Sequence, residues 1–149
     1  MQTLSTKKME TCSIEEYMKT EHAFSDGVYV RTVTMVEDSL VMGAKHKTTH
    51  MNIISKGKVT FSVDGIMTTV EAPCMFESFG GQAKVLYNHT EVVWSTIHVT
   101  EETDITKLEA MLADWTVGEK ELALIDSFYE ELTCHGSKVI DTKTTSLIH

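Results

Sequence analysis

The stretch from residue 43 to residue 59, GAKHKTTHMNIISKGKV, decides the fold of this chain. Two histidines, His46 and His50, precede a run of apolar and β-branched residues, and Gly57 interrupts the pattern before it resumes. Short runs of this kind, bounded by turn residues, are typical of strands. The stretch therefore predicts two strands joined by a tight turn at Gly57.

Further strand-like segments continue on both sides of this stretch. Asp64-Gly65 separates two of them and favours a type I′ hairpin turn, because both central residues of that turn need a positive φ. Pro73 ends another segment, at a position where a missing amide can be tolerated. Many short strands with closely spaced turns are typical of a sandwich or a closed barrel. The predicted strands are 28–36, 39–42, 49–55, 58–63, 66–71, 84–88 and 92–100.

Helical patterns flank the predicted barrel. Ser13 and Glu16 form a capping box, in which each side chain can satisfy the other residue's free amide, and they predict a short N-terminal helix. After residue 100, apolar residues recur at helical spacing and predict helices over 104–115 and 119–132. We therefore expect four parts: a helical segment 1–26, a barrel 27–100, helices within 101–135 that pack on the barrel or form a subunit contact, and a loosely held polar tail 136–149.

The composition excludes several classes of protein. The chain has 149 residues and a formal net charge of -9, without a dense run of Lys or Arg that could follow a phosphate backbone. Its three cysteines are widely spaced, which favours neither a disulfide framework nor a zinc ribbon. The sequence contains neither a secretory signal nor an apolar run long enough for a membrane span. We expect a cytoplasmic protein, in a host cell if a phage encodes it, that binds neither nucleic acid nor membrane.

The histidines and the glycine turn between residues 43 and 59 resemble the first motif of the cupin (RmlC-like) superfamily. In that motif, histidines precede a strand, a glycine turn and a second strand, and here Pro73 and the Gly80-Gly81 turn look like parts of the second motif. The chain is similar in particular to small single-domain cupin-like proteins of tailed bacteriophages, over residues 22–109. The shared elements are GVYVR at 27–31, HK at 46–47, GK at 57–58, AP at 72–73 and WSTIH at 94–98.

This resemblance implies a mainly β fold, a single double-stranded β-helix of the cupin or jelly-roll type, with one short N-terminal and two C-terminal helices. It implies the fold more specifically than the function, because one fold hosts many activities. The usual cupin metal site uses a His-x-His pair, a following glutamate and a histidine of the second motif. In this chain His46 is the only histidine of the first element, His50 stands where the glutamate would fall, and Lys84 lies near the position of the last histidine. The chain thus departs from the four-ligand pattern, since an ammonium cannot replace an imidazole as a ligand.

A candidate metal site follows from the spacing of the histidines. Side chains at even spacing share one face of a strand, so His46, Thr48, His50 and Asn52 should project together into the barrel if the strand already runs regularly at His46. His98, on the last predicted strand, is the best third ligand. Three histidines with open positions suit one divalent ion of Fe, Mn, Ni or Zn. The alternative is that the histidines are polar barrel residues that hydrogen-bond to one another and to their neighbours.

A candidate anion site lies at the same mouth of the predicted barrel. Lys45, Lys47, Lys84 and Arg31 would surround it, with Arg31 able to contact a carboxylate or phosphate at two points and Lys84 acting as a point charge. Asn52, on the same face as the histidines, completes the candidate ligand-binding residues. The alternative is a solvated rim whose cations pair with nearby acidic side chains.

Three classes of function remain open. The first is a metal-dependent enzyme that acts on a small anionic metabolite, with a reaction that the sequence does not assign. The second is a non-catalytic phage protein that sequesters a small metabolite or nucleotide. The third is a structural or oligomerisation protein that uses its C-terminal helices, and the resemblance to cupins implies a homodimer. We expect a cupin that binds a metal, a small anion or both.

Overall fold

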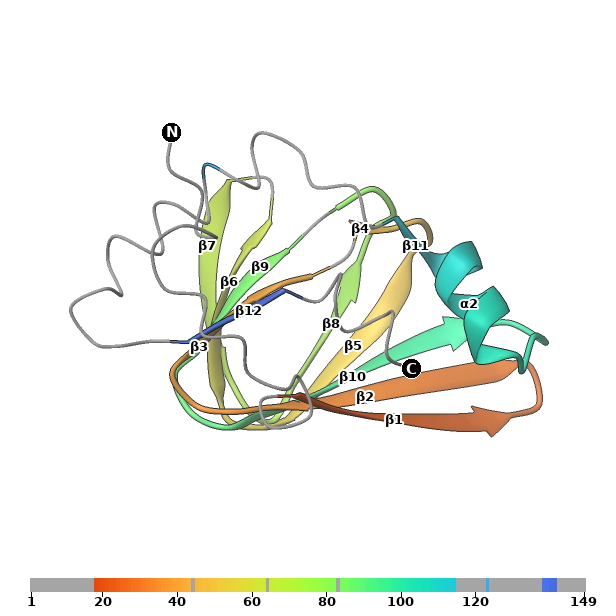
Figure 1. Cartoon of the computed structure of the whole chain (residues 1–149), viewed down its shortest axis with the longest axis horizontal. Helices are drawn as coiled ribbons and strands as arrows, with labels where there is room; N and C mark the ends of the chain where they lie inside the picture. The colour runs from red at the N-terminus through yellow and green to blue at the C-terminus, as the bar shows by residue number, and fades with distance from the viewer. Residues whose placement is uncertain are drawn as a thin grey trace.

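Two five-stranded sheets form the chain, which is described from a computed structural model covering residues 18–43, 45–63, 65–82, 84–114, 123 and 138–141. Figure 1 shows them facing each other as the two walls of a barrel. The first sheet has the order β1 (Met18–Ser25), β2 (Val28–Met35), β10 (Val92–Val99), β5 (His50–Lys56), β8 (Cys74–Ser78). The second has the order β12 (Lys138–Asp141), β3 (Ser39–Met42), β9 (Val85–Asn88), β6 (Lys58–Val63), β7 (Ile66–Glu71).

Strands that follow each other in the sequence mostly lie in different sheets. From β2 to β10 the strands alternate between the two sheets, except for the short β4 (Lys45–His46) and the antiparallel hairpin of β6 and β7. Such alternation is the connectivity of a jelly roll. The predictions of a mainly β barrel and of a hairpin at residues 64 and 65 are therefore confirmed.

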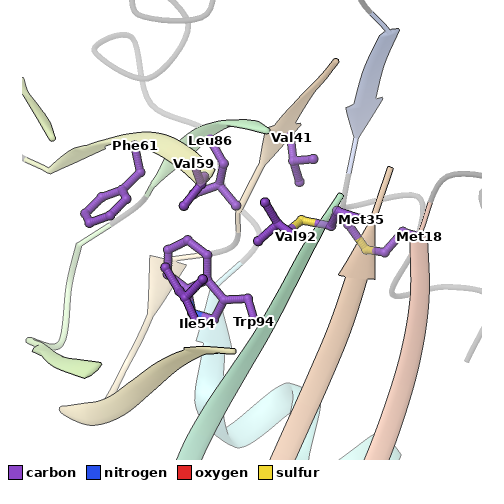
Figure 2. Close-up of a cluster of buried hydrophobic side chains, with 9 residues drawn as sticks. All are labelled: Met18, Met35, Val41, Ile54, Val59, Phe61, Leu86, Val92 and Trp94. Carbon is purple, nitrogen blue, oxygen red and sulfur yellow. The ribbon is translucent and has the colours of Figure 1, made fainter. Parts of the chain in front are cut away.

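Apolar side chains from both sheets fill one half of the barrel. Met35, Ile54, Val59 and Val92 are almost fully buried, and Figure 2 shows side chains of the two sheets pointing toward one another. The ring of Trp94 lies across this core, with centroids 5.5 Å from Phe61 and 5.6 Å from Phe76 in edge-on contact. Next to this core, polar side chains join apolar ones in lining a cavity, and the candidate site lies there.

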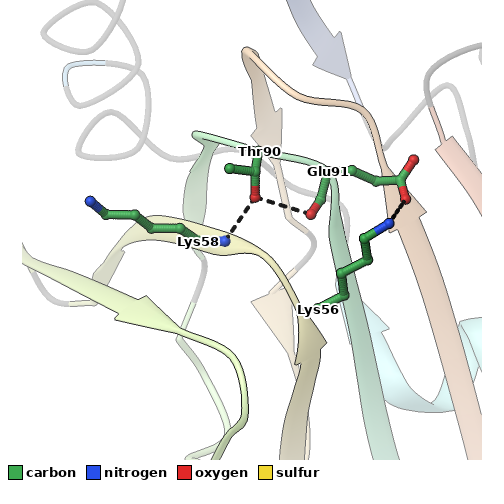
Figure 3. Close-up of polar contacts among 4 residues, drawn as sticks. All are labelled: Lys56, Lys58, Thr90 and Glu91. Atoms are coloured by element: carbon green, nitrogen blue, oxygen red, sulfur yellow. Dashed lines mark hydrogen bonds and ion pairs between the residues drawn. The ribbon is translucent and has the colours of Figure 1, made fainter.

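The turn at Gly57 joins the two strands predicted from the opening stretch. Gly57 has a φ of +94°, in the left-handed region that side chains disfavour. Thr90 braces this turn, because its Oγ1 accepts a hydrogen bond from the Lys58 amide and donates one to the Glu91 carbonyl, as Figure 3 shows. An ion pair of 2.7 Å between Lys56 and Glu91 lies beside it.

The first sheet begins earlier than predicted. Residues 18–25 were assigned to a helical segment ending at residue 26, but they form β1, which pairs in antiparallel register with all of β2. Their alternation explains the strand, because Met18 is buried while Lys19 and Glu21 face solvent. The capping box at Ser13 and Glu16 lies outside the described residues.

The sequence pattern also missed β8. Its inward residues Cys74, Phe76 and Ser78 alternate with the exposed Met75 and Glu77, so each face of the strand mixes apolar and polar residues. Such a mixed pattern gives no periodic signal, and pairing with β5 determines the structure instead. Gly80 and Gly81 form a turn directly after this strand, as predicted.

The C-terminal part differs from the two helices and loose tail that were predicted. Helix α2 spans Ile105–Leu112, is capped by Asp104, and is followed at once by the short strand β11 (Ala113–Asp114). Within the predicted tail 136–149, Lys138–Asp141 form β12, which pairs in parallel with β3. Trp115 and nearly all of the predicted helix 119–132 lie outside the described residues. In the part of the chain that is described, no helix is long and apolar enough to cross a membrane.

Candidate metal centre

His46 is held at the barrel mouth by three segments. It belongs to β4, whose partner β11 places Ala113 opposite His46. The His46 carbonyl accepts a hydrogen bond of 2.8 Å from the amide of Gly81, and the next amide, that of Lys47, donates to the Leu112 carbonyl. The Gly80-Gly81 turn can approach this closely because Gly80 has no side chain. A Cβ atom at that position would lie only 2.6 Å from the Lys47 carbonyl oxygen.

His50 lies at the start of β5 with its ring orientation fixed. Its Nδ1 is 3.0 Å from the Thr48 carbonyl oxygen. A carbonyl only accepts, so Nδ1 carries the proton and Nε2 keeps a lone pair for a ligand. The prediction that His46 and His50 share one strand is wrong, because residues 47–49 break the strand and Thr48 is exposed. The two imidazoles meet nevertheless, with ring centroids 4.3 Å apart.

His98 completes the group from the last strand of the barrel. It faces inward on β10, is 3 % exposed, and lies opposite Tyr29 of β2. Its ring centroid is 4.8 Å from that of His50 and 5.5 Å from that of His46. One ligand atom from each of the three histidines lies within 4.8 Å of the others. The structure thus brings together the three histidines predicted to hold a metal.

The surroundings keep these imidazoles neutral, which is the form that binds a metal. The pKa of His46 is lowered to about 2 and that of His98 to about 4, chiefly by burial and in smaller part by the neighbouring histidines and cations. Burial also lowers the pKa of His50, although its bond to Thr48 opposes this. The Nδ1 atoms of His46 and His98 are buried without a hydrogen-bond partner among the described residues. Nitrogen ligands about 2.1 Å from an ion lie roughly 3–4 Å apart, so small side-chain adjustments would close this set around one ion.

The three histidines line a partly open cavity of about 110 Å³. Roughly 10–15 Å³ is enough for one water on this measure, so the cavity can hold a small organic molecule. Helix α2 covers the open end of the barrel beside β10 and β2 (Figure 1). Leu108 and Leu112 pack from this helix onto Tyr29.

Two predicted cations, Arg31 and Lys84, line the same cavity. Arg31 projects from β2 and Lys84 precedes β9, so they approach from opposite sheets. The Lys84 carbonyl accepts the amide of Gly43, which fixes the backbone there. Lys84 is 8 % exposed, and burial lowers its pKa to about 8. Burial lowers the pKa of Arg31 too, while Tyr29 and Glu109 oppose this change.

Two predicted ligand-binding residues have other roles in the structure. The ammonium of Lys47 donates a hydrogen bond of 2.9 Å to the Ala110 carbonyl near the end of α2, so it anchors the helix at an exposed position. Asn52 does line the cavity, but its side-chain oxygen accepts from Trp94 and its amide nitrogen donates to Ser78. Asn52 therefore serves as part of the cavity floor.

The sequence reasoning overlooked Glu109 and Tyr29, which also line the cavity. Tyr29 shares the inward face of β2 with Arg31, and its hydroxyl is 2.7 Å from Nδ1 of His22 on β1. The alternation of β2 could have revealed Tyr29, because residues two apart on a strand point the same way. No local signal marks Glu109, since its contact with the cavity depends on how α2 docks.

Comparison with known proteins supports the fold and leaves the reaction open. No family model and no curated protein sequence matches the chain. Among solved structures, it is similar to a salicylate 1,2-dioxygenase mutant from Pseudoaminobacter salicylatoxidans, with a TM-score of 0.54 and 9% identity over 67% of this chain and 30% of that one. It is also similar to protein NMB1881 from Neisseria meningitidis, with a TM-score of 0.50 and 13% identity over 61% and 100% of the two chains.

A cupin superfamily protein from Desulfitobacterium hafniense gives a TM-score of 0.49 with 11% identity over 55% of this chain and 76% of that one. At such low identities, structural likeness shows a shared fold and no shared activity. The two structures with TM-scores of 0.50 and 0.54 thus show that this chain shares their fold, and the cupin resemblance of the sequence stays a prediction.

Proposed function

We propose that this chain is a metal-binding cupin-type protein whose centre takes a small anionic molecule at its open coordination positions. His46, His50 and His98 would hold one divalent ion of Fe, Mn, Ni or Zn. The proposal depends on one observation, the convergence of three imidazoles, of which His50 and His98 are buried and His46 is half-buried, with ligand atoms within 4.8 Å of one another. Three protein ligands leave positions free for a bound molecule, and the ion would act there as a Lewis acid.

The cavity charges support an anionic ligand. Among the described residues, the side chains of Arg31 and Lys84 form no hydrogen bond or ion pair, although Lys84 is buried and both residues line the cavity. Burying a charge without a partner is costly, and an anion bound between these groups would offset the cost. Arg31 and Lys84 would hold the anion and orient it toward the ion.

Metal analysis tests the proposal directly. Protein purified without chelators or a metal-affinity tag, and then reconstituted with each candidate ion, should hold one ion per chain by elemental analysis. His50→Ala and His98→Ala should lower the affinity by at least about tenfold, the scale for loss of a supporting group in a metal site. His89→Ala is the matched control, because His89 is exposed and bonded to Thr60. Absence of metal after reconstitution, or equal binding by the histidine variants and the control, would refute the proposal.

A second candidate is a non-catalytic binder that sequesters a small metabolite, as a phage-encoded protein could do. The unpartnered Arg31 and Lys84 favour it as well, since they would bind an anion with or without turnover. The two candidates differ in their products. Incubation of the metal-loaded protein with a ligand that it binds, followed by mass spectrometry of the small molecules, should return the ligand unchanged if the protein only sequesters it.

A further inference from the structure

Helix α2 brings a carboxylate into the cavity, a group that the metal proposal does not use. Leu108 and Leu112 are four residues apart and lie on one face of α2, where both pack against Tyr29. Glu109 follows Leu108 directly and therefore flanks this buried face. Its side chain lines the same cavity as the three histidines.

One oxygen of the Glu109 carboxylate lacks a hydrogen-bond partner in the described part of the chain. This atom, Oε1, is buried. Arg31 is close enough to affect the charge of Glu109, but these two side chains form no ion pair within 4.0 Å in the described part of the chain. A buried acceptor without a donor is unfavourable, so a donor from a bound molecule would stabilise this arrangement.

The cavity therefore presents two complementary kinds of group. Arg31 and Lys84 offer donors and positive charge, while Glu109 offers an acceptor and negative charge. The proposed metal centre lies among them at the three histidines. A ligand with only negative groups would satisfy the cations and repel Glu109, whereas a ligand with only donors would do the reverse. A molecule that carries both kinds of group matches the whole cavity.

We propose that the ligand is a small amino or hydroxy acid, whose carboxylate is held by Arg31 and Lys84 and whose amino or hydroxyl group donates a hydrogen bond to Glu109. This inference rests on the proposed function, because it names the ligand class of the same cavity. The volume agrees with it, since about 110 Å³ is seven to eleven times the ~10–15 Å³ that one water requires. Glu109 would thus determine specificity.

Four probes of similar size separate the features of such a ligand. Lactate and alanine carry a carboxylate and a neighbouring donor. Pyruvate carries a carboxylate and a neighbouring oxygen that can also reach the ion, but it lacks the donor, and propionate lacks both. Titration calorimetry of the metal-loaded protein at fixed ionic strength should show that lactate or alanine binds at least about tenfold more tightly than pyruvate and propionate, the scale for one hydrogen bond to a charged group.

Variants of Glu109 and Arg31 test which side chain causes the preference for acids that carry a donor. Glu109→Leu, with circular dichroism and metal content as folding controls, should bind lactate, alanine and pyruvate within about threefold of one another, because the acceptor is gone. If that variant does not fold, Glu109→Gln replaces it. In Glu109→Gln the ratio of the affinity for alanine to that for pyruvate should fall, because the ammonium of alanine loses its carboxylate partner. Arg31→Met should weaken all acids by about tenfold or more.

The outcomes distinguish this inference from the proposed function. A protein that holds no metal refutes the proposed function, and the preference for a donor can then still be measured in the metal-free cavity. Equal binding of lactate, alanine and pyruvate to the parent protein would overturn the inference while the metal centre stands. So would an unchanged preference in folded Glu109 variants, or failure of all four acids to bind a protein with full metal content.

Discussion

The indole Nε1 of Trp94 donates a hydrogen bond of 2.9 Å to the side-chain oxygen of Asn52. This bond joins the aromatic core to the cavity wall. The Trp94 ring packs in the core with Phe61 and Phe76, and both Trp94 and Asn52 line the cavity. Asn52 also donates to Ser78 Oγ at 2.8 Å, so its amide is fully used within the protein and forms a fixed floor under the histidines.

Replacing Asn52 should therefore destabilise the fold. Asn52→Leu keeps the volume but leaves the buried Trp94 donor and the Ser78 hydroxyl without this partner, and each unsatisfied buried group costs about 1–3 kcal/mol. We expect the free energy of unfolding in urea to fall by about 2 kcal/mol or more. The control is Thr60→Val, which removes exposed hydroxyl contacts with Thr69 and His89 and should change stability by less than about 0.5 kcal/mol. Equal effects of the two variants would contradict this account of Asn52.

The metal-free protein should lose stability as the pH falls. The folded-state pKa values of His46 and His98, about 2 and about 4, lie below the ordinary value of 6.5. The unfolded chain therefore binds protons first, and stability present above pH 6.5 is lost as the pH falls from there toward the folded-state values. The slope should reach up to about 1.4 kcal/mol per pH unit for each histidine.

Chemical denaturation of chelator-treated protein between pH 7 and pH 4.5 measures this slope. His98→Phe should reduce the slope, since the variant has no imidazole to protonate there. His89→Gln should reduce it less, because His89 is exposed and lies away from the cavity. A stability that does not change across this range would show that the cavity histidines are not protected from protonation.

Lys84 and Lys47 should differ in their effect on anion binding. Lys84 is buried in the cavity, while Lys47 is exposed and bonded to the Ala110 carbonyl. Lys84→Met should weaken binding of lactate to the metal-loaded protein by about tenfold, since a charge-assisted contact is lost. Lys47→Met should leave binding unchanged and lower the melting temperature only slightly. Calorimetry measures lactate binding by both variants. A larger loss of affinity in Lys47→Met than in Lys84→Met would mean that Lys47, and not Lys84, holds the anion.

Strand positions were largely predictable, because burial on one face of a strand leaves a periodic mark in the sequence. The inward residues His50, Asn52 and Ile54 of β5 alternate with less buried ones. This alternation in the sequence predicted that His50 and Asn52 point into the barrel. The prediction of a regular strand from His46 to His50 was wrong, but the two imidazoles nevertheless lie in contact. The Gly81 turn and β11 guide His46 to the cavity from outside the local pattern.

The groups that the sequence did not reveal reach the site through long-range contacts. β1 and β8 are edge strands with mixed faces, so pairing with β2 and β5 fixes them more than their own residues do. Glu109 lies on a helix whose docking depends on Leu108 and Tyr29, residues far apart in the chain. Lys47 shows the reverse case, since the residue before it, His46, lines the site while the Lys47 side chain bonds to α2.

The turn at Gly57 leads to a prediction that compares two glycines with similar backbone angles. Gly57 and Gly65 have φ values of +94° and +79°, so an alanine at either position adopts the disfavoured left-handed region, which costs about 1–2 kcal/mol. At Gly57 the new methyl group would also meet the Glu91 carbonyl oxygen at 2.1 Å, whereas at Gly65 nothing lies within 4 Å. Gly57→Ala should thus lower the free energy of unfolding by at least about 2 kcal/mol more than Gly65→Ala, on the scale of overpacking. Urea titrations of the two variants measure the difference, and equal losses would mean that the segment around Thr90 and Glu91 yields to the methyl group instead of holding the turn.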